Sequence, residues 1–334
     1  MGERRIRIAE VGGSTPLSST RPHCKINMKI NRRHTKTMPS LKGLFLATRP
    51  WSFTMSWVSV ALGGLIAWQD GKVSLAALLL TALGATLVHG ATNAVNDFFD
   101  TRYGVDTSQA PTARYRPHPI FTGLLSPRAL LWEALVLYGI AGAIGLALML
   151  RYSLWVFWIG LVGFLTSFLY TARPVAAKYR ALGEISVFLA WGPLMIQGAY
   201  AVQRNGLSIK AFWVSLPIGL LVALVLFANN ARDIAYDASR NIQTAASLLG
   251  KQKSLRAFIA LIALAYLLVV AMVPLGVLSP FGLLVFFSIP AAIKLVRGFL
   301  EGFPDAADAL TARLNLAFGS LLCLALFLEG ITAR

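Results

Sequence analysis

The chain has 334 residues, of which 56% are hydrophobic and 13% are charged, and its mean hydropathy is +0.64. Soluble domains carry about 25% charged residues, so this composition excludes an ordinary soluble domain and indicates a polytopic membrane protein. The formal net charge of +17 would suit a nucleic-acid partner, but 26 of the 31 basic residues fall on one side of the apolar segments. This one-sided distribution is the positive-inside pattern of membrane proteins and requires no nucleic acid. The other side keeps Lys72, Arg151, Arg204, Lys210 and Arg334.

Residues 1–41 are polar and basic, and they contain no apolar run long enough for a secretory signal. Low hydrophobicity combined with high charge predicts a disordered tail. Two alternatives stay open for this segment: translation could start at Met28 or Met38, or the segment could be an organelle-targeting peptide. The remainder, 42–334, is predicted to form one transmembrane domain.

Apolar windows of about 20 residues, the length that crosses a bilayer, recur through 42–334. They predict an all-α membrane protein with nine transmembrane helices. The basic residues place its N-terminus in the cytoplasm and its C-terminus on the other side. The predicted helices are 50–68, 73–97, 129–150, 153–171, 184–203, 211–231, 255–276, 279–297 and 314–332.

Amide and carboxylate side chains gather at the end of the second predicted helix. Their spacing of i, i+3, i+4 and i+7 puts them on one helical face. Gly104 permits a turn directly afterwards, which allows Asp106 to point back at the same place. Polar groups are costly at a membrane boundary, so a cluster there indicates function. The face consists of Asn93, Asn96, Asp97 and Asp100.

A second cluster ends the sixth predicted helix. Asn229, Asp233 and Asp237 are spaced i, i+4 and i+8, which again defines one helical face. Four predicted helices separate the two clusters, so both lie at the same, basic surface. A solvated helix end is the alternative for either cluster taken alone, but the repetition of one device favours a shared site. Because both clusters end helices next to water, we expect single alanine substitutions to change stability by no more than about 1 kcal/mol.

Hard oxygen ligands of this kind suit Mg²⁺ together with a phosphorylated ligand. Bound Mg²⁺ would neutralise carboxylates that otherwise repel one another, and nearby basic residues would bind the remaining phosphate oxygens. An isoprenoid diphosphate fits best, since its tail belongs in the membrane and its head at the boundary. The four histidines show no ligand spacing, and His89 is expected to pack or to form a hydrogen bond. The basic candidates are Arg116, Lys178, Arg180 and Arg232.

Several motifs together resemble the UbiA superfamily of intramembrane prenyltransferases, whose members have nine transmembrane helices and two Asp-rich motifs. Within it, 42–334 is most similar to the branch that prenylates 1,4-dihydroxy-2-naphthoate in menaquinone synthesis. The motifs are Arg49-Pro-Trp-Ser-Phe-Thr, Asn96-Asp-Phe-Phe-Asp100 with Gly104-Val-Asp106, Tyr170-Thr, Lys178-Tyr-Arg-Ala-Leu-Gly-Glu184, and Asn229-Asn-Ala-Arg-Asp233.

The resemblance implies an enzyme that uses Mg²⁺, a polyprenyl diphosphate and an aromatic acceptor at the cytoplasmic side of a prokaryotic inner membrane. It implies catalytic roles for Asp100, Asp233, Lys178 and Arg232. The implied Mg²⁺ ligands are Asp97, Asp100, Asp106, Asp233 and Asp237. The implied diphosphate-binding residues are Asn96, Asn229, Asn230, Lys178, Arg180, Arg116 and Arg232.

The chain departs from this branch at two places. It has Gln243-Thr-Ala-Ala where Lys-Thr-Leu-Ala is usual, and 114–123 also differs. The acceptor therefore stays open, with 4-hydroxybenzoate, haem, chlorophyllide and a glycerol phosphate as alternatives. A cation-coupled transporter is the alternative from another class, but transporters place such acids near the midplane of the membrane. An inactive scaffold is disfavoured because both motifs are intact. Prenyl chain length and oligomeric state are not predicted.

Overall fold

The computed structural model describes residues 40–107, 110–111, 116–240 and 242–333. The predicted tail, 1–41, lies almost entirely outside the described residues. Every regular element in the described ranges is helical, apart from one isolated bridge of β type between Arg180 and Gln243. The prediction of an all-α protein is confirmed.

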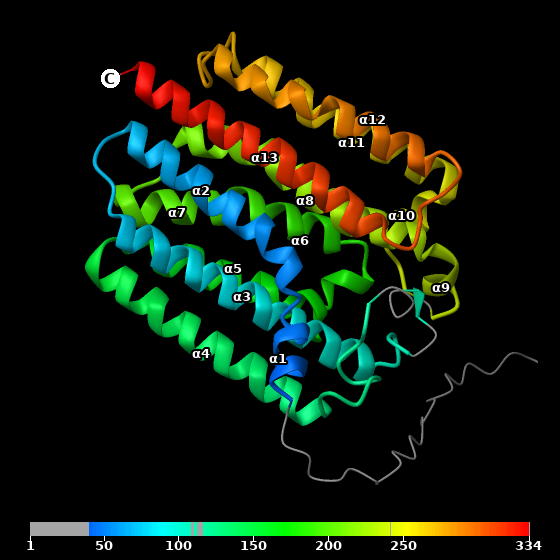
Figure 1. Cartoon of the computed structure of the whole chain (residues 1–334). Coiled ribbons are helices and arrows are strands. Elements are labelled where there is room, and N and C mark those ends of the chain that lie inside the picture. Colours follow the sequence, from blue (N-terminus) through cyan, green and yellow to red (C-terminus); the bar gives the residue numbers. More distant parts are fainter. Residues whose placement is uncertain (1–39, 108–109, 112–115, 241, 334) are drawn as a thin grey trace, which may run out of the picture. The chain divides into compact units, whose positions relative to one another are not determined.

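Long helices run side by side through the segment Pro39–Arg334 (Figure 1). Most of their bounds agree with the predicted apolar windows to within a few residues. The α-helices are α1 Leu41–Ala47, α2 Phe53–Gln69, α3 Leu75–Arg102, α4 Pro127–Arg151, α5 Trp155–Thr171, α6 Gly183–Leu189, α7 Met195–Arg204, α8 Ile209–Arg232, α9 Ile234–Ala238, α10 Ala245–Leu249, α11 Lys251–Met272, α12 Ile289–Phe299 and α13 Ala307–Thr332. Segments with other windings precede or join some of them: η1 Pro50–Ser52, η3 Ala177–Tyr179 and η5 Pro280–Ser288 are the tighter 3-10 helices, and η4 Ala190–Leu194 is a wider π-helix.

Eight helical segments in the described residues are long and apolar enough to cross a membrane. Three of them join shorter elements into one span: Leu41–Gln69, Gly183–Arg204 and Pro280–Phe299. The remaining predicted helix, 153–171, is present as α5, which has 17 residues and is shorter than the other eight. The count of nine membrane spans therefore stays a prediction.

The helix that begins at Gly183 changes its winding at η4, where Pro193 removes one backbone donor from the helical ladder. The backbone of α8 passes very close to this turn. A Cβ atom added at Gly192 would lie 2.9 Å from the Ser215 carbonyl oxygen and 3.0 Å from the Gly219 Cα atom. Trp191, next to Gly192, lines an interior cavity.

Apolar side chains divide between a packed interior and an outer surface suited to lipid. The main core joins α2, α7, α8, α11 and α13, and its fully buried members include Leu62, Ile218 and Phe318. Other large apolar side chains, such as Leu150 and Phe287, are exposed by 74% and 76%. A surface so rich in exposed apolar residues is compatible with a bilayer and not with water.

Candidate active site

A cavity of about 870 Å³ reaches the end of the bundle where α3 and α8 finish. Side chains from both acidic clusters line it, so the structure brings the two clusters together as the sequence predicts. Cavity-lining residues from the first cluster are Asn93, Asn96, Asp100 and Asp106, and those from the second are Asn229, Asn230, Asp233 and Asp237. Two predicted cations, Arg116 and Lys178, line it as well.

Away from the acidic end, the cavity is walled by apolar and small residues of α3, α4, α5 and α7. Val88, Leu148, Ile159 and Val202 represent the four helices. The cavity therefore combines a polar end at the helix termini with an apolar interior that extends between the helices. Such a space suits an amphipathic ligand with a charged head and a long apolar tail.

The acidic end of α3 is held by a buried network around Asp100, whose side chain is 1% exposed. The Lys178 ammonium donates to one Asp100 oxygen, and the Tyr179 hydroxyl donates to the other. Lys178 also donates to Asn96 Oδ1 at 3.0 Å, and the Thr171 hydroxyl donates to the same atom at 3.2 Å. Burial lowers the pKa of Lys178, but attraction to Asp100 outweighs burial and raises that pKa above its ordinary value. Lys178 is therefore a permanent cation at the cavity wall.

A glycine turn brings Asp106 back towards α3. Gly104 has φ +72°, and the Val105 and Asp106 amides donate to the Asp100 carbonyl oxygen at 2.8 and 3.1 Å. These are the bonds that close a helix after a left-handed residue, for which glycine is favoured. The predicted turn at Gly104 is confirmed.

The Asp106 carboxylate contacts His118, which sequence reasoning did not single out. His118 Nε2 lies 3.3 Å from Asp106 Oδ2, while His118 Nδ1 accepts the Ile120 amide at 3.3 Å. The proton therefore belongs on Nε2, which donates to Asp106. Burial raises the pKa of Asp106, but the hydrogen bond from His118 and the charge of Lys178 outweigh it and hold that pKa below its usual value.

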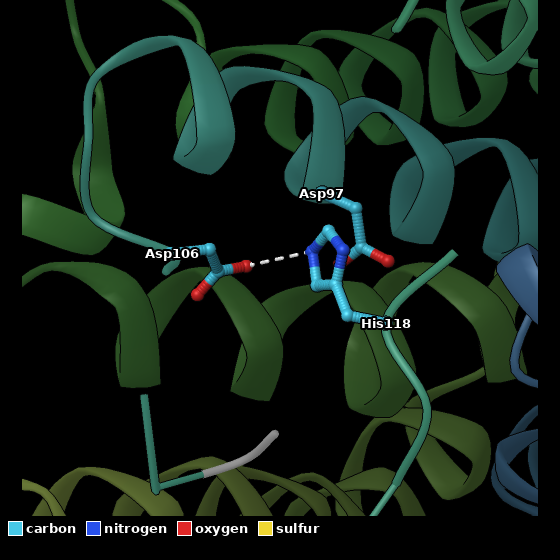
Figure 2. A group of neighbouring side chains, drawn as sticks. All are labelled: Asp97, Asp106 and His118. Carbon is cyan, nitrogen blue, oxygen red and sulfur yellow. Dashed lines mark hydrogen bonds and ion pairs between the residues drawn. The ribbon is translucent and has the colours of Figure 1, made fainter. Parts of the chain in front are cut away.

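Figure 2 shows that the imidazole lies between the carboxylates of Asp106 and Asp97. Each of these three residues offers one possible metal-ligand atom, and the three atoms lie within 4.8 Å of one another, so together they could hold a metal ion. Asp97 does not line the main cavity. Its carboxylate forms an ion pair with Arg49, a residue held at φ +54° just before Pro50.

The second cluster bends instead of continuing as one helix. α8 ends at Arg232, Asp233 separates it from α9, and Asp237 follows one turn later. Arg232 does not line the cavity, and its guanidinium donates to both Asp233 carboxylate oxygens at 2.6 and 2.7 Å. It also donates to Asn229 Oδ1 at 2.7 Å. Arg232 thus holds the side chains of Asn229 and Asp233 in place without itself lining the cavity.

Asp237 differs from the other cavity carboxylates, because no hydrogen bond or ion pair to its side chain is present among the described residues. It is 8% exposed and lines the cavity. Burial, followed by repulsion from Asp233, raises the pKa of Asp237 to about 7. A buried carboxylate next to other carboxylates and without a cationic partner is a position where a bound cation would be strongly favoured.

Arg180 lies at the surface and does not line the cavity. Its backbone pairs with that of Gln243, and the adjacent Ala181 amide donates to the Gln243 carbonyl oxygen at 2.8 Å. Asn230 lines the cavity and donates to Glu184 Oε1 at 2.9 Å. Most of the predicted diphosphate-binding residues therefore line the cavity. Arg180 and Arg232 are the two that do not.

A series of hydrogen bonds at the cavity wall links Arg49 to Trp191 through His89. Ser52 Oγ donates to the Arg49 carbonyl oxygen at 2.7 Å, and Trp191 Nε1 donates to Ser56 Oγ at 3.1 Å. The two serines contact His89 Nε2 and Nδ1 at 3.1 and 2.9 Å. Ser52 must then accept from Nε2, and Ser56 must donate to Nδ1. The expectation that His89 packs or forms a hydrogen bond is confirmed.

Sequence spacing did not identify three residues at this site, and two of them lie far along the chain from their partners. Arg49 pairs with Asp97 across 48 positions, and Tyr179 bonds Asp100 across 79. His118 lies only 12 positions from Asp106, so its nearness to an acidic motif was a usable signal.

A profile of the UbiA prenyltransferase family matches residues 56–325. The 1,4-dihydroxy-2-naphthoate octaprenyltransferase of Bacillus subtilis is 31% identical over 309 residues, which cover 90% of this chain and 98% of that protein. The UbiA prenyltransferase domain-containing protein 1 of Danio rerio is 31% identical over 325 residues, which cover 95% of this chain and 94% of that protein.

Solved structures share the fold. The apo structure of a UbiA homolog from Aeropyrum pernix K1 has a TM-score of 0.62 and 20% identity, covering 84% of this chain and 97% of that one. A UbiA homolog from Archaeoglobus fulgidus bound to GPP and Mg²⁺ has a TM-score of 0.58 and 14% identity, covering 84% and 99%. The family profile spans most of the chain and the relatives match it over nearly their full length, so this chain belongs to the UbiA prenyltransferase family.

Proposed function

We propose that this membrane prenyltransferase transfers an isoprenoid chain from a polyprenyl diphosphate to 1,4-dihydroxy-2-naphthoate, a step of menaquinone synthesis. The observation that carries the reaction class is the cavity of about 870 Å³ that joins both acidic clusters to an apolar interior. A diphosphate suits the polar end, and an isoprenoid tail suits the interior. The acceptor is inferred from the similar protein of Bacillus subtilis, a 1,4-dihydroxy-2-naphthoate octaprenyltransferase.

Mg²⁺ fits the donor set at the polar end. The lining residues offer carboxylate and amide oxygens, which are the hard ligands that this ion prefers. Asp237 supports the fit most directly, since it is buried and has no cationic partner among the described residues. We infer that Asp100, Asp106, Asp233 and Asp237 hold the ion or ions, with Asn96 and Asn229 as amide donors. Asp97 remains a proposed ligand through its group with Asp106 and His118.

The chemistry that bound Mg²⁺ supplies is electrostatic stabilisation of the departing diphosphate. Lys178 adds a fixed positive charge at the cavity wall, where it can bind phosphate oxygens. Arg116 lines the same cavity and is a second candidate for that contact. Arg232 and Arg180 do not line the cavity, so we propose that they support residues that do. Arg232 orients the Asp233 carboxylate. Arg180 belongs to the loop that positions Lys178.

The apolar interior excludes water from the allylic cation that forms when the diphosphate leaves. The aromatic side chains of Tyr170 and Trp191 line the cavity, and their faces can stabilise a cation electrostatically. An electron-rich acceptor ring placed against the same wall would then attack the cation, and the ring would regain aromaticity by losing the proton from the carbon that forms the new bond. The protein contributes orientation, fixed charge and a dry surface.

The distribution of basic residues supports one orientation of the chain in the membrane. We propose that the ends of α3 and α8 face the cytoplasm of a prokaryotic inner membrane, because 26 of the 31 basic residues accompany that surface. We also propose that α5 is a ninth span, since 17 residues rise about 25 Å, near the lower limit for a crossing. The catalytic domain would then be 42–334, with the preceding tail outside it.

Product analysis tests the proposed function. Purified protein is incubated with Mg²⁺, polyprenyl diphosphates of several lengths, and an acceptor panel that includes 1,4-dihydroxy-2-naphthoate and 4-hydroxybenzoate. Mass spectrometry should find prenylated naphthoate as the main product. Transfer to 4-hydroxybenzoate alone would refute the proposed acceptor and keep the reaction class. No transfer to any acceptor, from protein that unfolds cooperatively, would refute both.

A further inference from the structure

Tyr236 belongs to the second acidic cluster in sequence but contacts the first cluster in space. It precedes Asp237 on α9, and its side chain lines the cavity. Its hydroxyl donates to the Val105 carbonyl oxygen at 2.8 Å. The same hydroxyl lies 3.0 Å from Thr107 Oγ1. Because its single proton is used on Val105, the Thr107 hydroxyl must be the donor in the second bond.

These two bonds bracket Asp106 in the chain. Val105 and Thr107 are its immediate neighbours, so one phenol fixes the backbone on one side of Asp106 and a side chain on the other. The same turn is joined to α3 by the Val105 and Asp106 amides, which donate to the Asp100 carbonyl oxygen. Tyr236 therefore joins this turn of the first cluster to α9 of the second.

Arg240 reinforces the contact from one turn further along. Its guanidinium donates to the Gly104 carbonyl oxygen and stacks over the Tyr236 ring, with 5.0 Å between Cζ and the ring centroid. Gly104 is the left-handed residue that permits the turn. Two side chains that follow Asp233 in the sequence therefore bond Gly104, Val105 and Thr107, the residues on either side of Asp106.

We propose that Tyr236 is a positioning residue that fixes Asp106 relative to Asp237, so that the two acidic clusters bind one divalent cation–diphosphate complex jointly. Asp106 follows α3 and Asp237 lies on α9, and both line the cavity. Carboxylates of this kind bind a metal tightly only when they are held at a fixed separation beforehand. The inference rests on the proposed diphosphate chemistry and adds the residue that couples the two clusters.

The test measures binding without turnover. Tyr236→Phe removes the hydroxyl and keeps the ring that stacks under Arg240. Mg²⁺ is titrated in the presence of inorganic pyrophosphate, by calorimetry and by the rise in unfolding temperature. Loss of one hydrogen-bonded contact should weaken the apparent Mg²⁺ affinity by about fivefold. In turnover assays the Mg²⁺ concentration for half-maximal rate should rise by a similar factor, while the acceptor KM stays unchanged.

Tyr200→Phe is the matched control. The Tyr200 hydroxyl donates to Asp70 Oδ2 at 2.7 Å, and Tyr200 does not line the cavity. This variant loses a comparable hydrogen bond, so it should lower the unfolding temperature without changing Mg²⁺ affinity. Arg240→Met is a second variant that removes the bond to Gly104 and should also weaken Mg²⁺ binding.

The outcomes separate this inference from the proposed function. If wild-type protein binds Mg²⁺ with pyrophosphate and transfers the prenyl group, but Tyr236→Phe and Arg240→Met titrate as wild type does, the positioning role is refuted alone. If Tyr200→Phe weakens Mg²⁺ affinity as much as Tyr236→Phe, the effect is general destabilisation and the role is again refuted. Wild-type protein that neither binds nor transfers would overturn both proposals.

Discussion

Lys178 and Asp100 form an ion pair that joins the turn η3 to the last turns of α3, with the Asp100 side chain 1% exposed. The expectation that this acid lies beside water is therefore wrong, and its burial changes the stability effect that we expect from substitution. Removing one partner of a buried pair leaves the other charge without compensation, which costs about 3 to 5 kcal/mol. Asp100 thus contributes to the fold as well as to the proposed site.

The first prediction separates these two contributions. Asp100→Asn and Lys178→Met should each lower the unfolding free energy, and the double variant should be less destabilised than the sum of the two, because no buried charge then remains. All three should lose at least about a hundredfold in prenyl transfer, since the charge needed at the diphosphate is missing. SDS-titration unfolding and product assays measure both effects. Additive stabilities would show that the pair is not coupled.

The second prediction concerns metal dependence. Because Asp237 is buried without a cationic partner among the described residues, the polar end should need a bound cation. A chelator should abolish prenyl transfer, and added Mg²⁺ should restore it. Asp237→Asn should raise the Mg²⁺ requirement and change stability little, because it breaks no ion pair in the described structure. Full turnover in excess chelator would contradict the prediction.

The third prediction concerns topology. Ser239 follows α9 at the basic end, and Asn205 follows α7 at the other end; both are exposed. In a background without Cys24 and Cys323, a cysteine at Ser239 should react only with reagents that enter the cytoplasm. A cysteine at Asn205 should react with impermeant reagents on intact cells. The reverse pattern would mean that the proposed orientation is wrong.

The fourth prediction concerns the end of the bundle remote from the cavity. Lys210 pairs with Glu329 and donates to Gln69 Oε1 at 2.8 Å, which joins α8, α13 and α2. Glu329 also accepts the Ser279 amide at 3.2 Å. Lys210→Met should lower the unfolding free energy by about 2 kcal/mol, because charged hydrogen bonds are lost.

Prenyl transfer by Lys210→Met should be unchanged at temperatures where the variant is folded, since Lys210 does not line the cavity. Lys72→Met is the control on the same surface: Lys72 is exposed and forms no ion pair among the described residues, so its stability should match wild type. A loss of activity in folded Lys210→Met would show that the two ends of the bundle are coupled.

The predicted faces of α3 and α8 were largely right, and their exceptions are informative. Asn93, Asn96 and Asp100 share one cavity wall as their spacing requires. Asp97 does not, because Arg49 reaches it from the preceding helical segment and neutralises it there. Helical periodicity orients a side chain relative to its own helix, but it carries no information about which neighbour will occupy that side.

Local rules acting over a few residues determined much of this protein from the sequence. Apolar windows predicted the helices, and Gly104 predicted the turn that returns Asp106. The membrane orientation inferred from the charge distribution stays a prediction. The tertiary structure decided which of the predicted cations line the cavity. Lys178 lines the cavity and Arg180 does not, although they are two residues apart. That difference follows from the pairing of Arg180 with Gln243 and from the burial of Lys178 against Asp100, contacts across 63 and 78 positions of the chain that exist only once the helices have packed.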